Sequence, residues 1–417
     1  MPYPLAAAHG GKVLQPSVPW YLAGGVPILA YQPKGAASLA ASYVNLANPG
    51  TYDAAPGTAP AFATETGWTF GSNRYLTTGV TPGQNWSMLV QFLESADTNG
   101  GIVAGSLNGS NRFWIWPANT DTSHNWGHGG DLSVAGRLRA GVAVLSGPTA
   151  YLNGQVEGTI SAGSYTFAPI FIGCVNLTGP SYYFGGIVER VALYDRVLTP
   201  TEVTALYNAV GKTAVMFGDS ISAGVGATDY AHRWATLVAN ARGYTSNTQG
   251  IAGSVLQNTA QTTSDVIGGA VINNGRDTHA ARVIQQKPTY VYILYGLNDL
   301  RLNDAAFSDT QFGNDLGEVV DGIVADGVLA DNIVIGSPPY IPESSYATFA
   351  PWNGGSRVKH AAYTAACAAV ATAKGTRYAN VYQYMTDHGG DTLVSGDTIH
   401  PNDAGHAAIA AAFLAEL

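Results

Sequence analysis

The run TAVMFGDS, residues 213–220, decides the fold of the second half of the chain. Residues 214–217 are apolar, as in a buried strand, and Gly218-Asp219-Ser220 then breaks the run. Downstream, the apolar runs 290–295 and 333–336 alternate with stretches of helical periodicity. Helices are predicted over 234–242, 315–325, 357–373 and 404–414. Because strands and helices alternate, the pattern predicts a parallel sheet with helices on both faces.

The part of the chain before this run, from about residue 31 to 209, has the pattern of an all-β domain. Short segments rich in Val, Ile, Tyr, Phe and Trp alternate there with clusters of Gly, Asn, Pro and Ser. Residues 87–92 and 112–116 alternate with period two, and Asn153-Gly154 lies between apolar runs, which is typical of a hairpin turn. Many short strands with hardly a helix among them predict a β-sandwich.

The remaining stretches define the expected domain borders. Residues 1–30 are rich in Pro, Gly and Ala without periodicity, and we predict an irregular arm or linker there. The sandwich is then expected over 31–209 and the second domain over 212–417, with the boundary near Gly211-Lys212. A length of 417 residues agrees with two cores.

The composition narrows the classes of partner. Only 11% of the residues are charged and the formal net charge is −9, which disfavours nucleic acid and suits uncharged ligands such as sugars. No stretch approaches the ~20 apolar residues of a membrane helix, so no membrane partner is expected. The first residues do not resemble a signal peptide. We still expect a protein that acts outside the cell. Either a signal peptide is missing from this sequence, or the protein leaves its cell another way, for example as part of a virus particle. The oligomeric state stays open.

The chain has two cysteines, Cys174 and Cys367, which lie in different predicted domains. Small or apolar residues flank each of them, and neither has the spacing of a zinc ligand. They are predicted to be buried free thiols.

Reactive residue types recur where strands of the predicted parallel sheet end. Ser220 follows the first strand, Asn298 follows the strand at 290–295, and Asp397 and His400 precede the last helix. Carboxyl ends of parallel strands meet at one edge of a sheet, so these residues are expected to lie together.

These residue types fit the chemistry of acyl transfer. A serine hydroxyl needs a base such as His400 to remove its proton, and Asp397 can orient the imidazole. The oxyanion needs donors, which the side chain of Asn298 and the backbone N–H groups of Ser220 and Gly253 can supply. Each motif alone also has a plainer interpretation, as a turn, a cap or a helix N-terminus, and His406 within the last helix is expected to be structural.

In combination, these motifs resemble those of the SGNH hydrolase family, also called GDSL-type esterases. The matching blocks are Gly218-Asp219-Ser220-Ile221, Gly253 in 249–254, Gly296-Leu297-Asn298-Asp299 and Asp397-Thr398-Ile399-His400-Pro401. Ile221 stands where the family often has Leu, and Gly250 is an alternative to Gly253 in the second block. The resemblance covers about 212–417. It implies a flavodoxin-like α/β/α fold and ester hydrolysis through an acyl-serine intermediate, with no metal or cofactor required for catalysis.

Residues 183–203 resemble the closing motif of laminin-G-like, concanavalin-type sandwiches, in which a strand is followed by a short helix. Thr199 would cap that helix with Glu202 reaching back. The resemblance spans about 31–209 and implies an all-β jelly-roll sandwich. Such domains bind glycans in many proteins, whereas in others they only pack or contact proteins.

Two groups of residues in this domain are candidates for ligand binding. Trp114, Trp116 and Trp126 are candidate sugar-binding residues, although tryptophans on strands often belong to the core. A polar, glycine-rich stretch that we expect to be a loop contains a candidate cation site, with a plain surface loop as the alternative; its residues are Asp121, His124, His128 and Asp131. Proteins of this class can bind calcium, so the resemblance allows a calcium ion here.

The leading hypothesis is therefore a serine esterase that deacetylates a polysaccharide to which the sandwich binds. A lipase-like or thioesterase-like hydrolase of lipids or small esters is the alternative enzyme. A binding or viral tail module without activity is the alternative outside enzymes, and the intact set of Ser220, Asn298, Asp397 and His400 argues against it.

Overall fold

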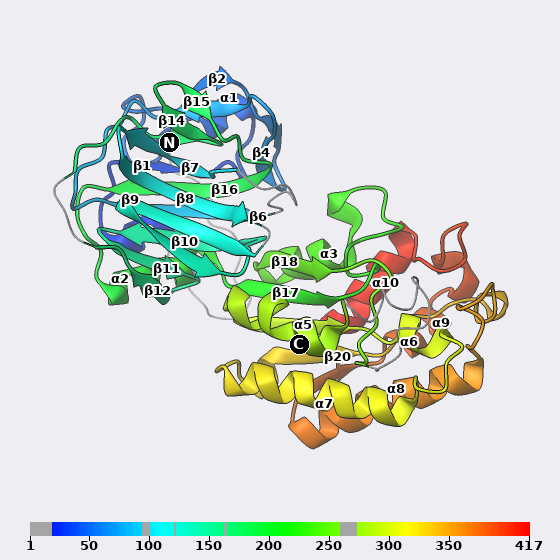
Figure 1. Ribbon diagram of the computed structural model, residues 1–417. Coiled ribbons are helices and arrows are strands. Elements are labelled where there is room, and N and C mark those ends of the chain that lie inside the picture. The colour runs from blue at the N-terminus through cyan, green and yellow to red at the C-terminus, as the bar shows by residue number, and fades with distance from the viewer. Residues whose placement is uncertain (1–18, 94–100, 121, 162–164, 259–272) are drawn as a thin grey trace, which may run out of the picture.

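A computed structural model describes residues 19–93, 101–120, 122–161, 165–258 and 273–417 of the chain. These residues form a β-sandwich followed by an α/β domain, and the two domains are in contact (Figure 1).

The N-terminal domain consists of two mostly antiparallel sheets that pack face to face. The first contains, in spatial order, β12 (Gln155–Thr159), β11 (Thr149–Leu152), β10 (Gly141–Ser146), β6 (Ser87–Leu93), β16 (Gly186–Tyr194), β4 (Gly67–Phe70) and β3 (Ala61–Ala63), with β1 (Leu29–Tyr31) also paired to β16. The second contains β15 (Pro180–Ser181), β14 (Val175–Leu177), β7 (Ala104–Asn108), β13 (Phe171–Ile172), β5 (Tyr75–Thr77) and β2 (Ala55–Thr58), and β8 (Asn111–Thr120) joins β7 to β9 (Ser123–Ala135). Apolar side chains from both sheets fill the space between them, which confirms the predicted sandwich.

The start of the domain differs from the sequence prediction. Residues 19–30 do not form a linker, because they contain the 3-10 helix η1 (Trp20–Gly24) and β1, and their side chains Trp20 and Leu29 are buried. Residues 1–18 of the predicted arm lie outside the described residues. A short helix, α1 (Leu39–Ser42), follows β1.

Two local predictions in this domain are confirmed. Asn153 and Gly154 have φ of 51° and 81° and join β11 to β12, as a two-residue hairpin of the predicted type requires. Thr199 and Glu202 form a reciprocal capping box at the start of α2 (Pro200–Val210). Cys174 and Cys367 are buried and free, as predicted.

The C-terminal domain contains a five-stranded parallel sheet. Its order is β18 (Thr245–Gly250), β17 (Thr213–Gly218), β19 (Tyr290–Leu294), β20 (Ile333–Gly336) and β21 (Arg377–Ala379). The order 2-1-3-4-5 along the chain is that of flavodoxin-like folds, as the sequence predicted.

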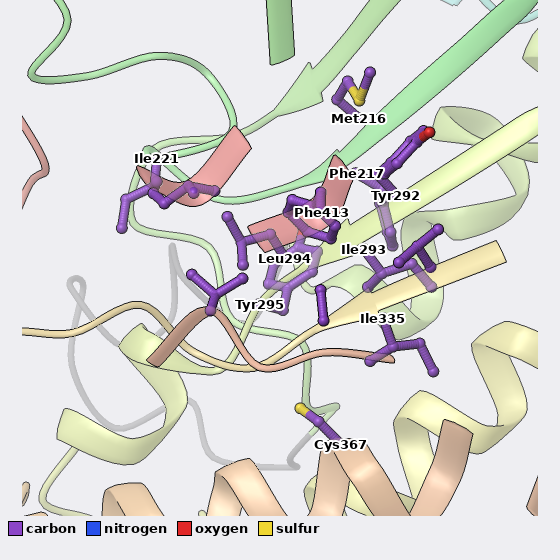
Figure 2. Close-up of a cluster of buried hydrophobic side chains, with 14 of the residues drawn as sticks. Met216, Phe217, Ile221, Tyr292, Ile293, Leu294, Tyr295, Ile335, Cys367 and Phe413 are labelled. Carbon is purple, nitrogen blue, oxygen red and sulfur yellow. The ribbon is translucent and has the colours of Figure 1, made fainter. Parts of the chain in front are cut away.

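Helices cover both faces of this sheet (Figure 1). One face carries α3 (Trp234–Arg242) and α10 (Asp403–Leu414), and the other carries α5 (Gly275–Arg282), α7 (Asp309–Ala325) and α8 (Arg357–Lys374). Shorter segments at the ends are α6 (Leu297–Arg301), α9 (Val381–Asp387), η2 (Tyr230–His232), η3 (Ile284–Gln286), η4 (Ala330–Asn332), η5 (Glu343–Ser345) and η6 (Gly390–Leu393). Figure 2 shows the apolar core, in which Phe413 of α10 lies against the strand residues Tyr292 and Leu294.

A buried polar interface joins the two domains. Asn153 in the β11–β12 turn donates through Nδ2 to the carbonyl oxygens of Gln286 (2.8 Å) and Lys287 (3.3 Å). Its Oδ1 accepts a hydrogen bond from the hydroxyl of Thr213 (2.9 Å) and another from the N–H of Val142 within the sandwich (2.9 Å).

The sandwich also covers the outer strand of the parallel sheet. Asn247 of β18 donates to the carbonyl of Ala140 (3.3 Å), and Gln91 of β6 donates to the hydroxyl of Thr245. These contacts lie along β18 and near the amino ends of β17 and β19. Tyr230, which follows β17 in the chain, also packs against the sandwich cluster of Leu93, Ala140 and Ile187.

Candidate active site

Ser220 lies in a tight turn directly after the central strand β17. The turn requires glycine at 218, since a Cβ there would lie 2.1 Å from Ser222 Oγ and 2.4 Å from the carbonyl of Leu294. The buried carboxyl of Asp219 accepts a hydrogen bond from the N–H of Ile221 (2.9 Å), which fixes the turn that presents Ser220.

The structure brings Ser220, His400 and Asp397 into one hydrogen-bonded chain. His400 Nε2 lies 2.9 Å from Ser220 Oγ, and His400 Nδ1 lies 2.6 Å from Asp397 Oδ2. With the Nδ1 proton donated to the carboxylate, Nε2 is free to accept the proton of the serine hydroxyl. His400 and Asp397 both belong to the loop between η6 and α10, at the carboxyl edge of the sheet.

The carboxylate of Asp397 is held in its ionised form. Burial alone would raise its pKa, but hydrogen bonds from the ring and N–H of His400, the N–H of Ile399 and the hydroxyl of Ser395 hold the pKa of Asp397 well below its ordinary value. The side chain therefore carries a negative charge at every pH near neutrality, as stabilisation of an imidazolium requires.

Three groups remain candidates for the donors of the oxyanion site. The backbone N–H groups of Ser220 and Gly253 donate to no other described residue. Asn298 at the start of α6 is mostly buried and uses one amide N–H to bind the carbonyl of Ser254 (2.9 Å), which leaves the second N–H of the amide.

The geometry favours Gly253 over Gly250 as the glycine donor. Gly253 has a φ of 73°, and the space where a Cβ would stand is open. Gly250 is instead the last residue of β18, and a Cβ there would lie 2.2 Å from the N of Ala223 and 2.6 Å from the carbonyl of Asp219. Gly250 therefore permits close packing of β18 against the serine turn.

A buried arginine, which the sequence analysis did not identify, binds the ends of three strands next to the candidate site. Arg282 of α5 donates to Tyr295 Oη (2.7 Å), to the carbonyl of Gly218 (2.8 Å) and to the carbonyl of Gln249. It thereby ties together the ends of β17, β18 and β19. The helix α5 has few apolar residues, so no periodicity signalled it.

Two buried carboxyl groups lie beneath the site. Asp299 accepts hydrogen bonds from the N–H groups of Leu256 and Gln257 and so fixes the segment after Gly253. Burial, together with the charge of Asp299, raises the pKa of Asp219 to about 7. Burial likewise raises the pKa of Asp299 to about 6.

Of the candidate sugar-binding residues, one lies in the core, which is the alternative that the sequence left open. Trp126 is 0% exposed and packs between the two sheets, so it belongs to the core. Trp114 and Trp116 lie in a separate apolar cluster, where Trp116 packs against Tyr182 with ring centroids 5.5 Å apart. The side chain of Tyr182 is 49% exposed, whereas Trp114 is nearly buried.

The candidate cation residues do not form a ligand cluster. Residues 123–135 are the strand β9 rather than a loop, so neighbouring side chains alternate between its faces. His124 binds Glu157, His128 binds the carbonyl of Gln84, and Asp131 pairs with Arg112. Asp121 lies outside the described residues. Among the residues that the structure describes, no group of three or more His, Cys, Asp or Glu side chains is placed to hold a metal.

Comparisons with known proteins found two family models and several solved structures that are similar to parts of the chain. The "GDSL-like Lipase/Acylhydrolase family" matches residues 216–408, and the "Concanavalin A-like lectin/glucanases superfamily" matches residues 53–204. A solved lipase/acylhydrolase from Enterococcus faecalis is 20% identical, with 49% of this chain and 94% of that chain covered and a TM-score of 0.37. A catalytic mutant of an acetylxylan esterase from Geobacillus stearothermophilus is 19% identical, with 49% and 94% covered and a TM-score of 0.38. No curated protein matches the chain.

The family match of the C-terminal half supports a hydrolase of the esterase type. The C-terminal half of the chain matches the GDSL-like lipase/acylhydrolase family, and most of the N-terminal half matches the concanavalin A-like superfamily, in agreement with both resemblances. Within the described ranges, no helix has the length and apolar character needed to span a bilayer.

Proposed function

We propose that the protein is a serine esterase in which Ser220 is the nucleophile, His400 the general base and Asp397 the group that orients it. The observation that carries the proposal is the chain of hydrogen bonds from Ser220 Oγ to His400 Nε2 (2.9 Å) and from His400 Nδ1 to Asp397 (2.6 Å). A nucleophile, a base and an orienting carboxylate in contact form the arrangement that activates a serine hydroxyl.

In the first half of the reaction, Ser220 Oγ attacks the ester carbonyl while its proton passes to His400 Nε2. The oxyanion accepts hydrogen bonds from the N–H groups of Ser220 and Gly253 and from the free N–H of Asn298. The C–O bond to the alcohol then breaks, and the imidazolium returns its proton to the leaving alkoxide. In the second half, water attacks the acyl-serine with His400 again as base, which releases the acid and restores the hydroxyl.

For the substrate, we propose an acetylated polysaccharide that the sandwich binds. Three features support it: the low charge of the chain, the concanavalin A-like class of the N-terminal domain, and the aromatic pair Trp116 and Tyr182 outside its core. Aromatic faces favour contacts with sugar rings because both surfaces are largely apolar C–H and π groups.

The catalytic proposal is tested with Ser220→Ala on aryl esters. Turnover should fall by roughly a million-fold, because the hydroxyl is the acyl acceptor. Ser222→Ala is a matched control: its hydroxyl is buried in the same turn without a hydrogen-bond partner among the described residues, so its removal should leave turnover close to wild type. Wild-type turnover by Ser220→Ala would refute the assignment of the nucleophile.

The substrate proposal is tested by a series of aryl esters of increasing acyl length and by a panel of acetylated polysaccharides. Acetate release from a polysaccharide and preference for the acetyl ester are expected. A preference for long acyl chains would favour the lipase-like or thioesterase-like alternative. Trp116→Ala and Tyr182→Ala should weaken polysaccharide binding and leave aryl acetate turnover unchanged, because both lie in the sandwich; unchanged binding in both variants would remove this pair from the proposal.

A further inference from the structure

A cavity of about 390 Å³ is lined by residues of both domains. The sandwich contributes Thr122 and most of the segment 135–139, which connects β9 to β10. The α/β domain contributes residues 249–251 at the end of β18 and side chains from α5 and η3. The volume is within the usual range of small-molecule sites, which begins at about 300 Å³.

The described lining of this cavity is cationic and rich in amides. Arg137, Arg139 and Arg282 line it together with Gln249, Gln285 and Gln286, and no acidic residue is among the described residues that do so. This concentration is unusual in a chain with 19 Lys and Arg residues and a net charge of −9. Guanidinium groups bind carboxylate and sulfate through paired N–H donors, and amides bind sugar hydroxyl groups.

Among these arginines, Arg282 is buried and held by several hydrogen bonds, and one of its N–H donors has no partner among the described residues. Arg282 is 7% exposed, and its Nη atoms are used by Tyr295 and the carbonyls of Gly218 and Gln249. Its Nε and the Oε1 of Gln285 are buried and have no hydrogen-bond partner among the described residues. Buried polar atoms without partners are rare, and at the wall of a cavity they indicate a missing ligand or water.

The cavity adjoins the candidate active site. Gly250 packs against the turn of residues 219–223 that presents Ser220, and Arg282 binds the carbonyl of Gly218 at the start of that turn. Ile251, which also lines the cavity, lies two residues before Gly253. A polymer bound across the carboxyl edge of the sheet would therefore pass close to the cavity.

We propose that this interdomain cavity binds an anionic sugar unit of the substrate, with Arg137 and Arg139 as its direct cationic ligands. The proposal rests on the proposed function and narrows the substrate class to acidic acetylated polysaccharides. Both domains are needed to form the site, since the sandwich supplies Arg137 and Arg139 and the α/β domain supplies Arg282 and the glutamines.

The test measures binding in the Ser220→Ala background, so that no ester chemistry takes part. Glucuronate is the probe, titrated by calorimetry beside methyl glucoside, glucose 6-sulfate and inorganic sulfate. We expect glucuronate to bind and methyl glucoside not to bind. Tighter binding of glucose 6-sulfate would assign the sulfated sugar as the anionic unit, whereas binding of inorganic sulfate as tight as that of both sugars would overturn the sugar site.

The decisive variant is Gln285→Glu, which is isosteric and adds a carboxylate to the cavity. It should weaken glucuronate binding at least about tenfold, because like charges repel and the new carboxylate competes for the arginines. Gln155→Glu, which adds the same charge on exposed β12 outside the cavity, is the matched control and should leave binding unchanged. Arg137→Gln with Arg139→Gln should abolish binding, and Arg74→Gln in another part of the sandwich should not.

Unaltered glucuronate binding in Gln285→Glu, or no binding of glucuronate or glucose 6-sulfate by the Ser220→Ala protein, would overturn the proposal. Thermal melting keeps the test independent of folding defects, since Gln285→Glu should not lower the melting temperature if the added carboxylate pairs with the arginines. Failure of the esterase proposal would appear separately, as absence of aryl ester turnover in the wild-type protein.

Discussion

Asn153→Ala should destabilise the protein far more than an ordinary turn mutation. The Asn153 side chain is buried and makes four hydrogen bonds, to Val142, Thr213, Gln286 and Lys287. Each intramolecular hydrogen bond contributes about 1 kcal/mol, and a buried partner left unsatisfied costs about as much again or more. Alanine at a φ of 51° adds about 1 kcal/mol of backbone strain. The four hydrogen bonds and the strain together give an expected loss in the free energy of unfolding of about 5 kcal/mol.

The matched control is Asn73→Ala. Asn73 also has a positive φ, of 64°, but its side chain is exposed and makes no hydrogen bond to the described residues. Asn73→Ala should therefore cost only the strain, about 1 kcal/mol. Urea unfolding of both variants, followed by tryptophan fluorescence and circular dichroism, gives the two losses. A difference below about 1 kcal/mol between the variants would refute the view that Asn153 stabilises the domain interface.

Three further predictions concern catalysis and pH. Asn298→Ala should lower kcat on aryl acetate by roughly a hundred- to a thousand-fold with KM nearly unchanged, because an oxyanion donor acts in the transition state; a change in KM alone would make Asn298 a substrate-binding residue. Aryl ester turnover should persist in EDTA, because the proposed steps use only His400 and N–H donors; loss of turnover that a divalent ion restores would contradict this. Burial lowers the pKa of His406 to about 4. As pH falls, the histidine of the unfolded chain therefore binds a proton before that of the folded protein does. The free energy of unfolding should decrease by about 2 kcal/mol between about pH 7 and pH 5 for this reason. His406→Gln should remove this part of the decrease, and equal slopes in urea unfolding of variant and wild type would contradict the assignment.

Some strands of the parallel sheet could be predicted from the sequence, whereas another could not. Strands β17, β19 and β20 are buried on both faces and therefore appear as continuous apolar runs. β18 was missed because its sequence, TSNTQG, is polar, although most of its residues are buried. The physical reason is tertiary: its amide side chains are satisfied by partners such as Ala140 and Gln286, which no local pattern reveals.

The residues of the candidate site likewise differ in whether the sequence could predict them. Ser220, Asp397 and His400 could be placed together because a parallel sheet brings the carboxyl ends of its strands to one edge. Arg282 could not, since its importance depends on which carbonyl oxygens its helix happens to face. The sequence could not decide between the core and a binding face for Trp126, because the face of a strand that points to the core depends on its pairing with distant strands. Residues 19–30 pack onto the sandwich through contacts between Trp20 and distant elements, which composition alone does not show.

The cover that the sandwich provides over β18 has a consequence for the protein in solution. An outer strand of a sheet presents unpaired backbone groups and can pair with the strand of another molecule, which leads to aggregation. The sequence of β18, TSNTQG, contains neither a charged residue nor a proline that would oppose such pairing. The N-terminal domain thus acts as an intramolecular shield for the catalytic domain, and a preparation of residues 212–417 alone would expose this strand to self-association.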